Sequence, residues 1–250
     1  MTALFEIFRK DVLSPIGVID EAISKKLYPP YNTPEFIKSN LSQLIEELQI
    51  DAYNIYLEEE KAAGIKAIEE YIRNQLKPEG SAEDVIHIVA SMFTDLDRFF
   101  LSLTQSRRPR AGTAFEIILK TIVKKLGYPF TEQPVINGKP DFLMPGIEHY
   151  RKNPMDCIIF TAKRSLRERW RQIVTEGTRG LGFYLATIDE GVSETQLVEM
   201  LHNRIYLVVP SRIKKEIPAY IRTPNVISFE HFIRHHLDPA MVRWKENSII

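Results

Sequence analysis

Pro134-Val-Ile-Asn-Gly-Lys-Pro-Asp-Phe-Leu-Met144 and Asp156-Cys-Ile-Ile-Phe-Thr-Ala-Lys163 are two neighbouring stretches with the residue preferences of β-strands. In the first stretch, Asn137-Gly138 is a strong two-residue hairpin signal, and the second arm of this hairpin carries Asp141. In the second stretch, an apolar run predicts a strand over 156–162 that ends at Lys163. Antiparallel pairing of these strands would bring Asp141 and Lys163 side by side at one edge of a sheet.

Helices and strands alternate in the chain on both sides of this pair. Residues 112–126 carry apolar side chains on one helical face, and Gly127 follows as a stop signal. After Lys163 we expect a helix from about Leu166 to Thr178, a strand over 182–188, and a helix capped by Ser193 and Gln196. Strands over 205–209 and 226–228 and a final helix complete the order. This order predicts an α/β domain with a mixed β-sheet flanked by helices on both sides.

The first part of the chain is predicted to be all helical. Apolar residues recur at three- and four-residue steps from Phe36 to Leu48 and again from Ile65 to Leu76. We therefore divide the chain into an N-terminal helical region, residues 1–105, and an α/β domain, residues 106–250.

The composition is that of an ordinary globular protein, because 44% of the 250 residues are hydrophobic. No apolar run approaches the roughly 20 residues that cross a bilayer, and charged residues follow the first methionine too closely for a signal peptide. A single cysteine, Cys157, excludes an internal disulfide and a cysteine-based zinc cluster. We expect a cytoplasmic protein with no membrane partner.

The charges cancel overall, since 33 basic and 33 acidic residues are present, but they are unevenly distributed. Two segments are rich in basic residues: Arg107, Arg108, Arg110, Lys120, Lys124 and Lys125 in one, and Lys163, Arg164, Arg167, Arg169, Arg171 and Arg179 in the other. Local basic surface of this kind can hold a phosphate backbone although the net charge is zero.

Four residues form a candidate catalytic set. Asp141 and Lys163 meet at the predicted sheet edge, and the helices that flank the sheet can offer Glu176 and Glu116. Hydrolysis of a phosphodiester needs a divalent cation, and the carboxylates of Asp141 and Glu176 suit a hard ion such as Mg²⁺. A lysine near the metal can orient or deprotonate the attacking water, or stabilise the charge on the phosphate oxygens. The sequence does not choose between these roles.

The set Pro140-Asp141, Thr161-Ala162-Lys163, Arg167-Glu168-Arg169-Trp170-Arg171-Gln172 and Glu176 resembles the CCGG/CCNGG-recognising, EcoRII C-terminal-like family of type II restriction endonucleases, within the PD-(D/E)XK superfamily. In that family the usual acid two residues before the lysine is replaced by a glutamate on the following helix. The same departure occurs here, because Thr161 precedes Lys163 and Glu176 lies downstream. The resemblance covers roughly residues 107–210 and implies a restriction-endonuclease-like fold.

Family members use the Arg-Glu-Arg block to recognise C:G pairs. Carried over to this chain, Arg167 and Arg169 would donate hydrogen bonds to guanine N7 and O6, and Glu168 would accept from cytosine N4. Some CCGG-cutting relatives space this block one residue wider, which leaves the pairing of residue to base open. Arg107, Arg108, Arg110, Arg164 and Arg171 are candidates for contacts to the DNA backbone or a groove.

The resemblance implies Mg²⁺-dependent hydrolysis of both strands of double-stranded DNA at a short palindromic site, leaving 5′-phosphate ends. A palindrome implies two-fold protein symmetry, so a homodimer is expected, and relatives also form tetramers that bind two sites. The helical region over 1–105 would clamp DNA, supply the dimer interface, or do both.

Two other functions remain open at this point. A repair or junction-resolving nuclease would share the metal site but would not need the Arg-Glu-Arg block. A non-catalytic DNA-binding module would bind DNA without cutting it, and the complete set of Asp141, Lys163 and Glu176 argues against it.

Overall fold

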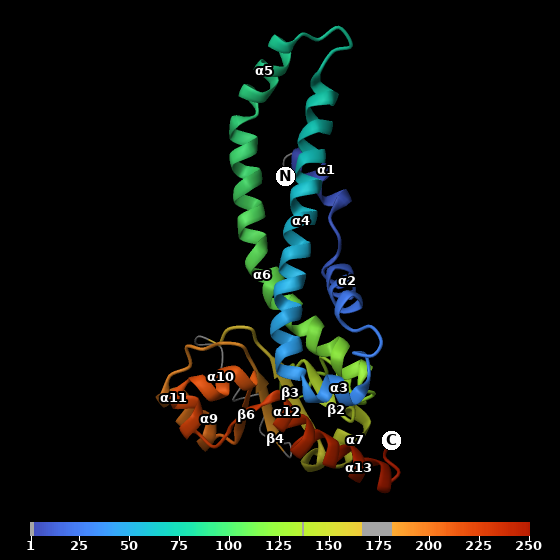
Figure 1. Cartoon of the computed structure of the whole chain (residues 1–250), viewed down its shortest axis with the longest axis vertical. Helices are drawn as coiled ribbons and strands as arrows, with labels where there is room; N and C mark the ends of the chain where they lie inside the picture. Colours follow the sequence, from blue (N-terminus) through green and yellow to red (C-terminus); the bar gives the residue numbers. More distant parts are fainter. Residues whose placement is uncertain (1–2, 137, 167–181) are drawn as a thin grey trace. The chain divides into compact units, whose positions relative to one another are not determined.

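The computed structural model describes residues 3–136, 138–166 and 182–250, apart from the side chains of Ala3 and Arg108. Its contacts divide the chain into two compact units. Unit 1 comprises Met1–Ser24 and Ile50–Ala114, and unit 2 comprises Lys25–Gln49 and Phe115–Ile250. Element labels follow Figure 1.

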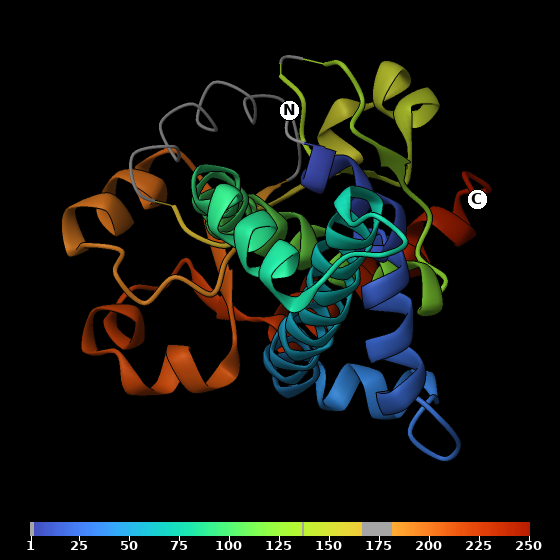
Figure 2. The same cartoon turned by 90° about the horizontal axis from the view of Figure 1, so that it is seen from above.

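Unit 1 is helical, as predicted for the N-terminal region. Its helices are α1 (Ala3–Asp11), the first part of α2 (Pro15–Lys26), most of α4 (Leu41–Gln75), α5 (Ala82–Ser91) and the first part of α6 (Phe93–Lys125). Figure 1 shows α4 and the α5–α6 segment side by side, and Figure 2 shows them nearly end-on. These two segments and α1 share one core, which is formed by Leu4, Ile7, Phe8, Ala63, Ala67, Met92, Phe99 and Leu103.

The boundary between the two units differs from the one that we expected from the sequence, between residues 105 and 106. Helix α6 runs through this point without a break, although it contains Pro109. A proline removes one helical hydrogen bond, but its neighbours Arg107 and Arg110 both hold α6 against α4. In addition, Lys25–Gln49, with α3 (Pro34–Ser39), belongs to the same unit as the sheet. Helical periodicity identifies such elements but does not show which core they join.

Unit 2 contains a six-stranded mixed sheet in the order β1-β2-β3-β4-β5-β6. The strands are β1 (Thr131–Glu132), β2 (Phe142–Met144), β3 (Ile158–Ala162), β4 (Gly182–Ala186), β5 (Ile205–Val209) and β6 (Val226–Ser228). The first three strands pair antiparallel and the last four pair parallel. The predicted α/β class with a mixed sheet is confirmed.

The connection between β1 and β2 is longer than the predicted two-residue turn. Thr131 pairs with Leu143 and Glu132 with Phe142, so residues 133–141 lie between the paired positions. The Gln133 backbone N–H still donates to the Asp141 carbonyl at 3.0 Å, but the next residues inward, Pro134 and Pro140, have no backbone N–H to continue the ladder. Asn137 itself lies outside the described residues.

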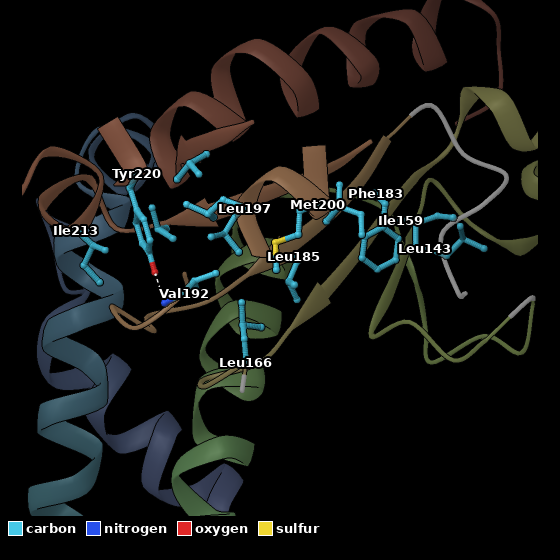
Figure 3. Packing of buried hydrophobic residues seen from close by; sticks show 14 of the residues in the cluster. Leu143, Ile159, Leu166, Phe183, Leu185, Val192, Leu197, Met200, Ile213 and Tyr220 are labelled. Atoms are coloured by element: carbon cyan, nitrogen blue, oxygen red, sulfur yellow. Dashed lines mark hydrogen bonds between the residues drawn. The ribbon is translucent and has the colours of Figure 1, made fainter. Parts of the chain in front are cut away.

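One face of the sheet is covered by short helices. Leu197 of α9 (Glu194–His202), Ile213 of α10 (Ser211–Glu216) and Tyr220 of α11 (Pro218–Arg222) pack in one cluster with strand residues such as Ile159 and Leu185 (Figure 3). The Tyr220 hydroxyl accepts a hydrogen bond from the Val192 backbone N–H at 3.2 Å and donates one to the Asp189 carbonyl at 2.7 Å. The buried hydroxyl is therefore satisfied, and it fixes the loop after β4.

The opposite face carries an aromatic ladder. Phe142, Phe160, Tyr184 and Tyr206 occupy paired positions on the four central strands. Phe232 of α12 (Phe229–Phe232) packs against this ladder, with ring centroids 5.1 Å from Phe160 and 4.7 Å from Tyr184. The chain then continues through η2 (Ile233–Leu237) into α13 (Asp238–Glu246). Side chains thus pack on both faces of the sheet, as is usual where strands run parallel.

The remaining elements of unit 2 precede β3: α7 (Ile147–Lys152) and the 3₁₀ turn η1 (Pro154–Asp156). Among the described helices, none is both long enough and apolar enough to cross a membrane.

Candidate active site

Asp141 and Lys163 meet at one edge of the sheet, as the antiparallel pairing of β2 and β3 predicts. Asp141 immediately precedes β2, and Lys163 immediately follows β3. The Lys163 Nζ atom lies 3.1 Å from Asp141 Oδ2. The same oxygen accepts the Ala162 backbone N–H at 2.7 Å. The Asp141 side chain is 6% exposed and that of Lys163 is 33% exposed. The carboxylate is therefore buried and held by the Ala162 N–H, while the Lys163 ammonium is accessible to solvent.

Glu116 joins this pair from the part of α6 that belongs to unit 2. Burial, and after it the negative charge of Asp141, raise the pKa of the Glu116 carboxyl above its ordinary value, while Lys163 acts in the opposite direction. Asp141, Lys163 and Glu116 therefore lie close enough together for their charges to interact.

Gln133 ties the two acids together, and the sequence did not identify it. Its side-chain Nε2 donates to Glu116 Oε1 at 3.3 Å, and its backbone N–H donates to the Asp141 carbonyl at 3.0 Å. Its φ of 41° lies in the left-handed region that non-glycine residues rarely adopt. From the sequence, the strand-like stretch was expected to begin at Pro134, after Gln133, and no pattern in the sequence shows that Gln133 turns toward Glu116.

Thr161 occupies the position two residues before Lys163, where the resemblance noted above leads one to look for an acid. It is buried, at 1% exposure, and lies on the same face of β3 as Lys163. Among the described residues its Oγ1 atom has no hydrogen-bond partner. A hydroxyl at this position supplies no charge, so the negative charge of the site comes from Asp141 and from acids outside β3.

The donor set fits a divalent cation in its chemistry. Burial, and after it the negative charge of Asp141, raise the pKa of Glu116, and a cation bound between these two carboxylates would relieve both effects. The described residues contain no group of three or more His, Cys, Asp or Glu side chains able to hold a metal ion. The predicted ligand Glu176 lies outside the described residues.

The predicted base-contacting residues Arg167, Glu168 and Arg169, together with Arg171, also lie outside the described residues. The structure does describe how the chain leaves β3 toward them. The Leu166 backbone N–H donates to Asp189 Oδ2 at 2.8 Å, and Thr187 Oγ1 donates to the Arg164 carbonyl at 3.2 Å. The segment after β3 is thus anchored to the loop after β4, and the Arg164 side chain is exposed.

Arg107 and Arg110 belong to unit 1 and are engaged with residues of α4 there. Arg107 donates to the carboxylate of Glu60, which is only 4% exposed, with an Nε–Oε1 distance of 3.0 Å. The Arg110 guanidinium carbon lies 4.5 Å from the centroid of the Tyr56 ring. Their proposed contacts to DNA therefore compete with contacts inside the protein, and the side chain of Arg108 is not described.

Comparison with known proteins places this geometry in a family. The model of the EcoRII C-terminal family matches residues 80–233. Type II restriction enzyme SsoII of Shigella sonnei is 27% identical over 239 residues, which are 90% of this chain and 77% of that enzyme. Type II restriction enzyme EcoRII of Escherichia coli is 30% identical over 181 residues, which are 62% of this chain and 45% of that enzyme, so this chain spans less than half of that relative.

Solved structures agree with these matches. Metal-depleted Ecl18kI in complex with uncleaved, modified DNA superposes with a TM-score of 0.75 at 26% identity, and covers 97% of this chain and 83% of that one. The PspGI–substrate DNA complex superposes with a TM-score of 0.62, covers 96% of each chain, and at 22% identity supports the fold alone. Because the family match covers more than half of the chain, the chain belongs to the EcoRII C-terminal family of type II restriction endonucleases.

Proposed function

We propose that this chain hydrolyses both strands of double-stranded DNA at a short palindromic site containing CCGG or CCNGG, with Mg²⁺, leaving 5′-phosphate ends. The relatives are type II restriction enzymes, and the similar structures are complexes with DNA. The observation that carries the proposal is the contact between Lys163 and Asp141 at the sheet edge, with Glu116 beside it. All three residues belong to unit 2. Apart from Lys25–Gln49, this unit lies within the proposed catalytic domain, residues 106–250.

Asp141 and Glu176 are the proposed metal ligands, and Glu116 is a further acid at the site. When bound, the metal would polarise the scissile phosphate and lower the pKa of an attacking water. The Ala162 backbone N–H holds Asp141 Oδ2 in place at 2.7 Å, so this carboxylate would meet the cation without rearranging. A carboxylate held ready in this way favours a catalytic role for the Asp141–Lys163 pair over a purely structural one.

Lys163 is proposed as the cationic catalytic group. Its side chain is one-third exposed, so its ammonium contacts Asp141 and is still accessible to solvent. From there it can stabilise negative charge on the phosphate oxygens, or orient and deprotonate the attacking water.

Arg167, Glu168 and Arg169 are proposed to contact the C:G pairs, and Arg107, Arg108, Arg110, Arg164 and Arg171 the DNA backbone or a groove. The hydrogen bond from the Leu166 N–H to Asp189 supports the proposed base contacts, because it fixes the residue that directly precedes the Arg-Glu-Arg block. Guanine O6 and N7 match an arginine fork, and cytosine N4 matches a carboxylate.

A palindromic target is bound most simply by a two-fold symmetric protein, so a homodimer is proposed, with tetramers binding two sites as a further state. The helical region over 1–105 is proposed to clamp DNA, to join subunits, or both. The cytoplasm of a bacterial or archaeal cell is the proposed location, since the curated relatives are from bacteria.

Digestion of a mixed plasmid DNA tests the proposal. Wild-type protein and the Asp141→Ala variant are each incubated with Mg²⁺ and with EDTA. Discrete fragments should appear only with wild type in Mg²⁺, and all their ends should map to one CCGG- or CCNGG-type site. Nicking without a common sequence would identify a structure-specific nuclease instead, and intact DNA on single-site and multi-site substrates would refute the proposed reaction.

A further inference from the structure

Two side chains of the connection between β1 and β2, residues 133–141, face solvent and have no part in the site described above. Val135 is 84% exposed, although it is apolar. Lys139 is exposed as well, and within the described part of the chain it has no ion-pair partner. A single exposed apolar side chain is ordinary, but one that lies beside an unpaired cation suits a partner that offers both an anion and an apolar surface.

The connection is anchored next to both side chains, so their exposure is a fixed feature of the fold. Pro134 is buried, and Ile136 packs against the core of unit 2. The Ile136 backbone N–H also donates to the Gly138 carbonyl at 3.0 Å. Pro140, which follows the lysine, is buried as well. The valine and the lysine are therefore presented to solvent by a backbone that the protein holds in place.

The position of Lys139 in the chain brings it close to the active site. It precedes Asp141 by two residues, so about 7 Å at most separates their backbone positions. The Asp141 carboxylate contacts Lys163 at the sheet edge and is a proposed ligand of the metal that polarises the scissile phosphate. The phosphates of one DNA strand follow each other about every 3.4 Å along the helix axis. When the scissile phosphate is bound at Asp141, its neighbours on the same strand therefore lie within reach of the Lys139 ammonium.

The charges around the connection favour an anionic partner. Glu132, which directly precedes it, is ion-paired with Lys120 and Lys124 of α6 at 2.5 and 3.1 Å. Within the connection itself, Asp141 is the one acidic residue, and it is 6% exposed. Lys139 therefore has no exposed carboxylate beside it on its own segment, and its charge is available to a phosphate of the DNA backbone.

We propose that Val135 and Lys139 form a further contact surface for double-stranded DNA, next to the active site. Lys139 binds a phosphate that neighbours the scissile one, and Val135 packs against the deoxyribose wall of the adjacent groove. This inference rests on the proposed function, because it needs the scissile phosphate at Asp141. Contacts to phosphate and sugar fix the register of a duplex without reading its bases, so this surface contributes affinity and positioning but no sequence preference.

The salt dependence of DNA binding tests the contact of Lys139. Fluorescence anisotropy of a labelled duplex is measured with the full chain in Ca²⁺, in place of Mg²⁺, over a range of salt concentrations. Lys139→Gln removes one phosphate contact, so the slope of log K against log salt should become shallower by about 1, and the affinity in about 0.1 M salt should fall roughly eightfold. Lys139→Arg keeps the charge and should bind as wild type does.

Lys152→Gln is the matched control, because it removes the same charge from an exposed lysine of unit 2. Lys152 ends α7 and precedes β3, whereas Lys163 follows that strand, so the control should keep the wild-type slope. The loss from Lys139→Gln should be the same for a duplex that carries the mapped site and for one that lacks it. A wild-type slope for Lys139→Gln, an equal change for Lys152→Gln, or a loss confined to duplexes with the site would overturn the backbone contact.

Val135→Ser tests the apolar half of the surface. It should weaken binding about tenfold at every salt concentration, because buried apolar area is lost but no charge. Val242→Ser on α13 is the matched control, since Val242 is 55% exposed, and it should leave the affinity unchanged. Both valines are exposed, so both melting temperatures should stay at the wild-type value. Equal affinities for the two variants would refute the role of Val135.

Parallel cleavage assays in Mg²⁺ keep this inference separable from the proposed function. A wild type that cuts DNA at one site, with an unchanged salt slope in Lys139→Gln, would refute only the contact surface. A protein that binds DNA through Lys139 but cuts none would support the surface and refute the proposed reaction. A wild type that binds no duplex would refute both.

Discussion

Replacement of Asp141 by asparagine should separate the chemistry of the site from the stability of the fold. Asp141 Oδ2 accepts two hydrogen bonds, from the Ala162 backbone N–H at 2.7 Å and from Lys163 Nζ at 3.1 Å. Asparagine has nearly the same shape and keeps a carbonyl oxygen for the Ala162 N–H, so only the charge is lost. Because Lys163 is one-third exposed and can be solvated, losing its partner should cost about 1 kcal/mol or less.

The effect of Asp141→Asn on cleavage should be far larger. A bound cation contributes several kcal/mol to the stabilisation of the transition state, and each 1.36 kcal/mol changes the rate about tenfold. Weakened metal binding should therefore lower the rate about a thousandfold. Asp141→Ala should be equally inactive but should lose about 1–3 kcal/mol of stability, because the Ala162 N–H is left without an acceptor in a buried position.

Single-turnover cleavage of a duplex that carries the mapped site, together with thermal unfolding of each variant, measures both quantities. The expected melting temperature of Asp141→Asn lies within about 2–4 °C of wild type for a chain of this size. An Asp141→Asn variant that cleaves at a rate comparable with wild type would refute the assignment of Asp141 as a metal ligand.

Three further predictions concern other contacts of the described residues. Gln133→Met removes the amide that donates to Glu116, and it should weaken metal affinity about tenfold without changing the melting temperature. Calorimetric titration with Mn²⁺ measures the affinity. An unchanged affinity would exclude a role of Gln133 in positioning Glu116. Burial opposes ionisation of Glu230, but hydrogen bonds from Ser211 and Ser42 outweigh it and lower the pKa of this carboxyl. Glu230→Gln should therefore lose about 2 kcal/mol at pH 7. The stabilisation from a lowered pKa is complete above the unfolded value of about 4.3 and is lost as the pH falls through the lower pKa of the folded state, so the difference from wild type should shrink over that range. A difference in urea unfolding that does not depend on pH would contradict this. Arg107→Met should destabilise the protein by about 2 kcal/mol, because among the described residues the buried Glu60 would keep the Tyr56 hydroxyl alone as a hydrogen-bond partner. Glu60→Gln in the same chain should restore part of the loss. A melting temperature equal to wild type would show that Arg107 is free to contact DNA.

The sheet could be predicted from the sequence where strands are short, apolar and clearly bounded. β5 and β6 coincide with the predicted strands over 205–209 and 226–228, and the helix capped by Ser193 and Gln196 has the capping box that its sequence indicates. Continuous apolar runs of this length have few alternatives to a buried strand. Helices α10 and α11 were not predicted, because six and five residues are too few to show a helical period.

The candidate site could be predicted where it depends on strand pairing. The adjacency of Asp141 and Lys163 follows from two antiparallel strands, and it is confirmed by their 3.1 Å contact. The role of Gln133 could not be predicted, because it depends on a left-handed backbone conformation that a glutamine does not signal. The engagement of Arg107 with Glu60 could not be predicted either, since it joins residues 47 positions apart on different helices.

Sequencing of the ends produced from a pool of random double-stranded DNA tests the central claim most directly. The pool is incubated with the wild-type protein and Mg²⁺, and the ends are ligated to adaptors that require a 5′-phosphate. The account predicts that the captured ends share one palindrome with outer C:G pairs, and that they disappear with EDTA or with Asp141→Asn. Captured ends without a common sequence, or equal numbers of ends from wild type and Asp141→Asn, would contradict it.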